Sequence, residues 1–427
     1  MKRNLCVGAT FLGVLVTLAI GNLVLEKKTA VQAASVMAPR FEVDPLWPKP
    51  LPNHWLMGQT IGVSVDAQDH VWVIHRAGSL EPGELHATTN PPTAQCCAPA
   101  PPVLVFDQAG NLINHWGGPG NGYDWPDSNH GITVDYKGNV WIGGNGRGPA
   151  PGAGRGGKQG AKQAPAKQST DDEGQVAGVQ SFNDNMILKF TQDGKFLMQI
   201  GKPRSSKGSN DVANLRLPAK IFVDKETNEA YIADGYGNHR VIVFDADTGQ
   251  YKRHWGAYGH KPDDVDLGRY DPDAPPAQQF RNPVHCAELS VDRLLYVCDR
   301  VNDRIQVFHP DGTFVKEQFV EKRTLGSGSA WDIAFSKDPQ QKYIYLTDGE
   351  NDRVHILDRQ SLEVLTTFGE GGRQPGEFYG VHSIATDSKG NIYTGETYRG
   401  QRVQKFVYKG MAAVTKADQG VVWPKSK

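Results

Sequence analysis

The chain has 427 residues, including 48 glycines and 27 prolines, and its 46 basic and 47 acidic side chains leave a formal charge of −1. So many glycines and prolines favour short strands joined by turns over long helices. The balanced charge excludes a strongly basic chain, so we expect no nucleic-acid partner.

The first 34 residues have the pattern of an export signal. Lys2 and Arg3 form a basic start, residues 11–25 are largely apolar, and residues 31–33 include small side chains at the cleavage positions. An uncleaved membrane anchor is the alternative, because the apolar run is long and charged residues follow it directly. We therefore expect a signal peptide over 1–34 and a periplasmic or secreted protein, with membrane attachment only if the leader stays uncleaved.

Repeated strand patterns fill the chain from residue 41 to residue 410. The third repeat has an apolar strand at 221–224 that ends in aspartate, a second strand at 230–234 and a third at 240–244. Similar units recur about every 45 residues, a period typical of a propeller blade. Six such units predict an all-β, six-bladed β-propeller over 41–410, followed by a C-terminal tail over 411–427.

Three insertions interrupt the rhythm of the blades. Residues 77–102 and 146–180 each separate the second and third strands of a blade, and residues 257–280 join blades three and four. The low-complexity composition of 146–180 cannot bury enough apolar surface to order itself, so we expect disorder there. Turns between second and third strands leave a propeller on the face where the inner strands begin. That face is the expected functional face.

Five cysteines, one of them Cys6 in the leader, leave four for an oxidising compartment. Cys286 and Cys298 flank the first hairpin of blade four, where they form either a cross-strand disulfide or two small buried residues. The adjacent Cys96 and Cys97 can close a vicinal disulfide, and a soft-metal site is the alternative.

Three histidines occupy the same place in every second repeat. His130, His285 and His382 begin the inner strands of blades two, four and six. Alternate blades of a six-membered ring lie a third of a turn apart, so the three imidazoles would point at one spot on the axis. Such a tripod holds a metal ion with one open position, and zinc is the metal that we expect. Each histidine taken alone could instead cap a strand.

Two further residues belong to the same face. Arg76 ends the second strand of blade one, where its guanidinium can lean over the channel or form an ion pair at the strand end. Tyr236 lies in the corresponding turn of blade three, between Gly235 and Gly237, where its ring can swing inward or simply pack.

These residues carry a resemblance to a known family. The Asn-His-Arg-Val run at 238–241, followed by an apolar strand, resembles the signature of the NHL repeat, a six-bladed propeller module. The three histidines resemble those of one branch, the peptidyl-α-hydroxyglycine α-amidating lyases (peptidylamidoglycolate lyases). The resemblance implies that the histidines bind Zn²⁺ and that Arg76 and Tyr236 are catalytic.

The chain departs from that family at several positions. The family has a proline before each histidine ligand and a cysteine where this chain has Gly237, so a disulfide at that position cannot form. The resemblance also implies a structural Ca²⁺, bound by the backbone carbonyls of Val63 and Ile132 and by a carboxylate. The carboxylate position is Ser383 here, which leaves the calcium site incomplete.

The sequence therefore predicts an exported, zinc-dependent carbon–nitrogen lyase with a small-molecule or peptide substrate, acting as a monomer. It would cleave a carbinolamide to an amide and an α-oxo acid such as glyoxylate, with Tyr236 as general base and Arg76 holding a carboxylate. Two alternatives stay open. One is a non-catalytic NHL propeller that binds protein or glycan, and the other is a metal-dependent hydrolase in which water takes the open position on the three-histidine site.

Overall fold

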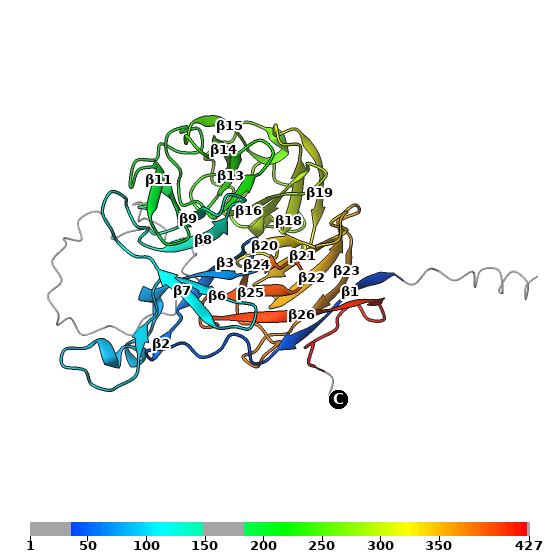
Figure 1. Ribbon diagram of the computed structural model, residues 1–427. Helices are drawn as coiled ribbons and strands as arrows, with labels where there is room; N and C mark the ends of the chain where they lie inside the picture. Colours follow the sequence, from blue (N-terminus) through cyan, green and yellow to red (C-terminus); the bar gives the residue numbers. More distant parts are fainter. Residues whose placement is uncertain (1–35, 148–182, 425–427) are drawn as a thin grey trace, which may run out of the picture.

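The computed structural model, which describes residues 36–147 and 183–424, contains six four-stranded antiparallel sheets around a common axis (Figure 1). The first strand of each blade contacts the first strand of the next, and blade six contacts blade one, so the ring is closed. The predicted all-β, six-bladed β-propeller is confirmed. The signal peptide expected over 1–34 and almost all of the insertion expected over 146–180 lie outside the described residues.

The first five blades follow the chain in order. Blade one contains β3 (Gln59–Val65), β4 (Val71–Arg76), β6 (Val103–Phe106) and β7 (Leu112–Trp116). Blade two contains β8 (Asn129–Val134), β9 (Val140–Gly144), β10 (Met186–Phe190) and β11 (Phe196–Gly201). Blade three contains β12 (Lys220–Asp224), β13 (Glu229–Asp234), β14 (Arg240–Asp245) and β15 (Tyr251–Trp255). Blade four contains β16 (Val284–Leu289), β17 (Leu295–Asp299), β18 (Arg304–Phe308) and β19 (Phe314–Phe319). Blade five contains β20 (Asp332–Phe335), β21 (Tyr343–Asp348), β22 (Arg353–Asp358) and β23 (Val364–Phe368).

Blade six is built from both ends of the described chain. Its inner strands are β24 (Val381–Thr386), β25 (Ile392–Glu396) and β26 (Arg402–Ala413), and its outer strand is β1 (Met37–Asp44). The pairing of β1 with β26 runs from Met37 opposite Ala413 to Asp44 opposite Lys405. The residues after β26 continue this closure, since the backbone N–H of Val43 donates to the carbonyl of Val422.

An aspartate ends or directly follows the inner strand in blades one, two, three and six, and Ser290 and Ser336 take its place in blades four and five. Asp66 accepts hydrogen bonds from two backbone N–H groups of the following turn, and the indole of Trp72 on the next strand donates to it at 2.9 Å. The same side-chain bond recurs in blades two and six, between Asp135 and Trp141 and between Asp387 and Tyr393. The aspartate thus fixes the register of the first hairpin, which is why aligning these residues aligns the blades.

The arginine of the Asn-His-Arg-Val run pairs within its own blade. Arg240 donates from Nε to Asp234 at 2.8 Å, and both side chains are fully buried. Its remaining nitrogens donate to the carbonyls of Ser209, Asp211 and Asn214, in the segment that links blades two and three. Arg240 thus ties blade three to the segment that precedes it.

The insertion after β4 folds into short pieces: η1 (Ala77–Ser79), η2 (Pro82–Glu84), η3 (His86–Thr88) and β5 (Ala98–Pro99), which pairs in parallel with β2 (Trp55–Leu56). Two more 3₁₀ turns are η4 (Ala257–Gly259) and η5 (Arg300–Asn302).

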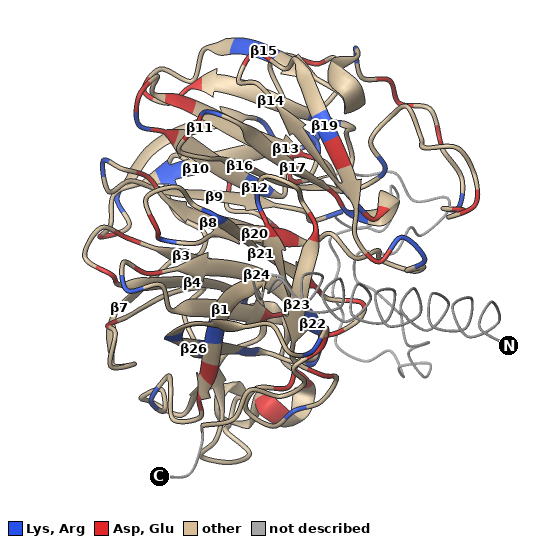
Figure 2. Cartoon of the chain, turned by 90° about the vertical axis from the view of Figure 1, so that its right-hand side faces the viewer, with Lys and Arg blue, Asp and Glu red and all other residues tan. Residues whose placement is uncertain are grey.

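Both cysteine pairs form disulfides, Cys96 with Cys97 and Cys286 with Cys298. In the view of Figure 2, basic and acidic residues are interspersed over strands and loops. No helix within the described ranges is both long and apolar enough to cross a membrane.

Candidate metal centre

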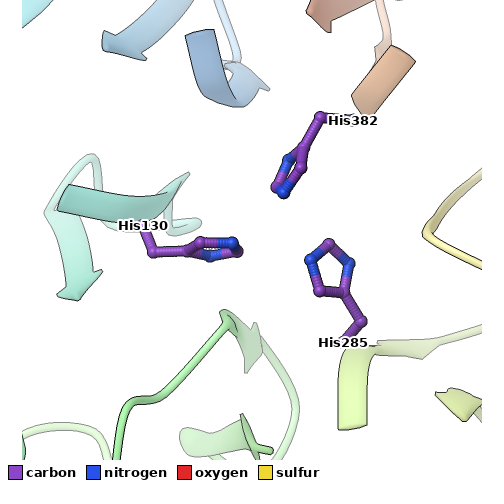
Figure 3. A group of neighbouring side chains, drawn as sticks. All are labelled: His130, His285 and His382. Carbon is purple, nitrogen blue, oxygen red and sulfur yellow. The ribbon is translucent and has the colours of Figure 1, made fainter. Parts of the chain in front are cut away.

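Three histidine side chains meet on the propeller axis. His130 on β8, His285 on β16 and His382 on β24 point toward one another from three directions (Figure 3). Their ligand atoms all lie within 4.8 Å of one another, and each residue is at most 2% exposed. The structure therefore brings together the tripod that the alternate-blade spacing predicts.

A β-bulge at each histidine turns its side chain toward the axis. His285 and His382 are themselves the extra residues in the pairing of β16 with β17 and of β24 with β25. In β8 the extra residue is Gly131, directly after His130. Gly131 has a φ of +71°, and a Cβ atom there would lie 2.3 Å from the carbonyl oxygen of Ala219. Only glycine fits, because this carbonyl must come close to the tripod.

Carbonyl groups of the intervening blades orient two of the imidazoles. Nδ1 of His130 lies 2.8 Å from the carbonyl oxygen of Ala219, and Nδ1 of His285 lies 2.6 Å from that of Trp331. A carbonyl can only accept, so each Nδ1 carries the hydrogen and each Nε2 keeps a lone pair in the neutral ring. Imidazoles that bind metals are usually oriented in this way.

Tyr236 lies directly against the tripod. It follows β13, and its hydroxyl oxygen is 2.8 Å from Nε2 of His130 and 2.8 Å from Nε2 of His285. Both Nε2 atoms are acceptors in the neutral rings and the phenol has one hydrogen, so only one of these contacts can be a hydrogen bond. The other requires a positive charge, from a proton on an imidazole or from a metal ion on the lone pairs. The donor set therefore fits a metal cation.

Arg300 is a member of the site that the sequence analysis missed. It begins η5, directly after β17, and its Nη1 donates to the Tyr236 hydroxyl oxygen at 3.2 Å. Its guanidinium lies 4.3 Å from the ring centre of Trp331 and is buried. The signal was present, because Arg300 directly follows the second strand of blade four at the position where Arg76 ends that of blade one.

Arg76 contacts the residue before His130 and is held by neutral groups. It donates to the side-chain oxygens of Gln59 at 2.7 Å and Asn145 at 2.8 Å, and to the carbonyl of Asn129, the residue before His130, at 3.2 Å. All three acceptors are uncharged, so these contacts leave the positive charge of Arg76 unneutralised. A pocket of about 410 Å³ lined partly by Arg76 and Gln59 opens next to it.

The residue before Arg76 contributes no charge to this region. Burial lowers the pKa of His75 to about 4, so its ring is neutral at physiological pH. Its Nδ1 accepts from the backbone N–H of Gly58 at 3.1 Å, and its Nε2 lies 2.9 Å from the carbonyl oxygen of Pro101. These two contacts fix the end of β4 and hence the position of Arg76.

The residues below the tripod do not fit calcium. Val63, Ile132 and Ser383 line one cavity together with Lys220 and Asp332. The Lys220 ammonium lies 2.6 Å from the Asp332 carboxylate, so a positive charge is already present there. The Ser383 hydroxyl supplies no negative charge to a divalent cation.

Comparison with known proteins finds distant relatives among the amidating enzymes. The chain is 23% identical to peptidylglycine alpha-amidating monooxygenase of Rattus norvegicus over 350 residues, which cover 80% of this chain and 30% of that protein. It is 26% identical to peptidyl-glycine alpha-amidating monooxygenase B of Xenopus laevis over 200 residues, 46% of this chain and 21% of that protein. The chain thus spans less than a third of the length of these relatives. The resemblance drawn from the motifs is confirmed.

A third relative is a repeat protein. NHL repeat-containing protein 3 of Mus musculus is 26% identical over 335 residues, which cover 77% of this chain and 70% of that protein.

No protein-family model matches the chain. Among solved structures, a streptogramin B lyase aligns with a TM-score of 0.47 and 14% identity over 87% of this chain and 98% of its own. A catalytically inactive virginiamycin B lyase from Staphylococcus aureus with quinupristin aligns with a TM-score of 0.43 and 11% identity over 90% of this chain and 94% of its own.

Proposed function

We propose that this chain is an exported, metal-dependent carbon–nitrogen lyase that cleaves a carbinolamide next to a carboxylate. The products are an amide and an α-oxo acid such as glyoxylate. The observation that carries the proposal is the position of the Tyr236 hydroxyl, 2.8 Å from two imidazoles of the tripod and 3.2 Å from the Arg300 guanidinium. One proton-transfer group thus lies between a metal-binding set and a fixed cation.

His130, His285 and His382 would hold the metal, and zinc suits three neutral imidazoles best. A zinc ion held there would supply a positive charge that makes a bound hydroxyl group more acidic. The burial of all three rings excludes bulk water from the ligand atoms, so nearby charges act through a medium of low dielectric constant.

Tyr236 would move the proton in this reaction. Arg300 donates to its oxygen, and a cation beside a phenol favours the ionised form. In that form Tyr236 takes the proton of the substrate hydroxyl, and the electrons of the O–H bond form the new C=O bond. The C–N bond then breaks, and its electrons stay on nitrogen. Tyr236 returns the proton to that nitrogen, so the amide leaves neutral and the residue is ready for another turnover.

Arg76 would orient the substrate. Its three hydrogen bonds to Gln59, Asn145 and the Asn129 carbonyl use three of the five N–H groups of the guanidinium. The remaining N–H groups and the positive charge suit a carboxylate at the mouth of the adjoining pocket. A carboxylate bound there would fix the carbon that bears both the hydroxyl and the nitrogen.

The similarity to amidating monooxygenases supports a substrate of the same kind. It extends over 80% of this chain, and it falls on a propeller whose alternate blades carry the histidines. This chain covers only 30% of the rat protein, so the similarity supports a reaction of the propeller and not the activity of the whole relative.

The test is to offer α-hydroxyhippurate to the zinc-loaded protein and to measure glyoxylate and bound metal. We expect one zinc per chain and turnover to benzamide and glyoxylate. His382→Ala is the control, since it removes a ligand and leaves Tyr236 and Arg300 in place. Glyoxylate production no faster than with His382→Ala would refute the lyase.

Two alternatives make different predictions in the same assay. A metal-dependent hydrolase would bind one zinc, release no glyoxylate and cleave an ester or amide instead. A binding platform, which the 26% identity to an NHL repeat-containing protein favours, would show neither reaction and would tolerate Tyr236→Phe without loss of ligand binding.

A further inference from the structure

A layer of buried charges crosses the channel directly beneath the tripod. The Lys220 ammonium on β12 lies 2.7 Å from the Glu288 carboxylate on β16 and 2.6 Å from the Asp332 carboxylate on β20. The three side chains are between 4% and 18% exposed. One ammonium thus joins the inner strands of blades three, four and five at the axis.

The members of this layer are chain neighbours of the groups that orient the imidazoles. Lys220 follows Ala219, whose carbonyl accepts from His130. Asp332 follows Trp331, whose carbonyl accepts from His285. A movement of either strand along the axis would carry one of these carbonyls away from its imidazole.

Asp332 extends the layer to the third histidine strand. Its second carboxylate oxygen accepts from the backbone N–H of Ile384 at 3.2 Å, two residues after His382 on β24. Glu288 lies three residues after His285 on β16. The layer therefore contacts β16 and β24, which carry two of the ligands. Lys220 and Asp332 also begin β12 and β20, which directly follow the two orienting carbonyls.

We propose that Lys220 is a positioning residue for the metal tripod, acting as a built-in cation that locks the inner strands in register. The inference rests on the metal site of the proposed function and adds to it the group that holds the site in shape. Lys220 and Asp332 line the same small cavity as the three histidines. The charged layer and the metal tripod are therefore close neighbours.

The two neighbouring carboxylates favour the charged form of Lys220. Burial alone would lower the pKa of its ammonium, but the charges of Asp332 and Glu288 raise the pKa above its usual range. Burial in turn raises the pKa of Glu288, against the effect of Lys220. Removing the ammonium would leave two carboxylates facing each other in the channel, and their repulsion would separate β16 from β20.

The test compares zinc affinity, measured by competition with a chromophoric chelator, in Lys220→Met and in a matched control. The control is Lys189→Met, which removes another buried lysine whose Nζ donates to the carbonyl of Ala246 in blade three, away from the axis. We expect zinc binding about 10- to 100-fold weaker in Lys220→Met, the range seen when groups that orient metal ligands are lost. Lys189→Met should keep the wild-type affinity even if it melts earlier.

A second variant and a second measurement keep the test decisive. If Lys220→Met does not fold, the variant combining it with Glu288→Gln and Asp332→Asn removes all three charges together and avoids the repulsion. The visible spectrum of the Co²⁺-loaded protein should change in either variant, because it reports the ligand geometry directly. Wild-type zinc affinity with an unchanged cobalt spectrum would overturn the proposal. Tight zinc binding by the wild type without glyoxylate release would instead refute the lyase and leave the positioning role standing.

Discussion

Replacement of Arg300 by methionine is the sharpest perturbation of the proposed chemistry. Methionine fills a similar volume against Trp331 and removes both the charge and the 3.2 Å hydrogen bond to the Tyr236 oxygen. None of the three metal ligands is changed, so we expect the variant to bind zinc as the wild type does. The effect on turnover should therefore come from the loss of a cation beside the proton-transfer group.

The expected magnitude follows from the strength of that contact. A hydrogen bond to a charged group is worth about 1.5–3 kcal/mol, and about 1.4 kcal/mol corresponds to a factor of ten in rate. If Arg300 favours the ionised phenol by this amount, its loss lowers kcat at neutral pH by roughly 10- to 100-fold. The acid limb of the pH profile of kcat should move upward by about one to two pH units, because ionisation now needs a higher pH.

The assay is glyoxylate release from α-hydroxyhippurate over a range of pH, with metal content measured in parallel. Arg300→Lys should recover part of the lost rate, since it restores the positive charge without the planar guanidinium group. Arg76→Gln is the matched control: it should raise KM and leave the acid limb in place, because Arg76 contacts Gln59 and Asn145 and not the phenol. An acid limb that stays where it is in Arg300→Met would refute the reasoning.

Three predictions concern stability. Burial and nearby carboxylates raise the pKa of Asp303 to about 8. Asp303 should therefore contribute less to stability in urea as the pH rises from about 4 to 8, so the stability of the wild type relative to Asp303→Asn should fall over that range; a constant difference would contradict this. Replacing Cys286 and Cys298 together by alanine opens a link between residues 12 apart and should cost roughly 3 kcal/mol, seen as a lower melting temperature that dithiothreitol no longer affects. Deleting Met37–Asp44 exposes the edge of β26 and should abolish cooperative unfolding by circular dichroism, whereas a sharp transition would show that blade six closes without its outer strand.

The blades and the tripod could be predicted because both depend on local patterns. In blades one, two and six the aspartate after the inner strand bonds to the turn and to an aromatic residue of the next strand, as Asp66 does with Trp72. These bonds fix the hairpin register within a few residues of sequence. Once the repeats are aligned on that residue, the alternation of His130, His285 and His382 is visible without any long-range information.

Other features depend on contacts that no local pattern encodes. The pairing of β1 with β26 has no local signal, since the two strands lie at opposite ends of the described chain. The sequence gives no prediction for Arg300, because its role comes from Tyr236 of the neighbouring blade. The bulges that turn the histidines inward each involve the backbone of a single residue. Only the bulge in β8 has a sequence signal, which is Gly131.

The pairing of the first described strand with the last sets an order for assembly. Blades one to five can form as the chain is made, but blade six has to wait for β26 and for β1 to return to it from the far end. His382 belongs to that blade, so two imidazoles can be in place while the third is still absent. The ring cannot capture a metal ion with full strength at any earlier stage, which makes tight metal uptake a late event in folding. A time course of zinc uptake during refolding would then follow ring closure and not the appearance of the β-sheets.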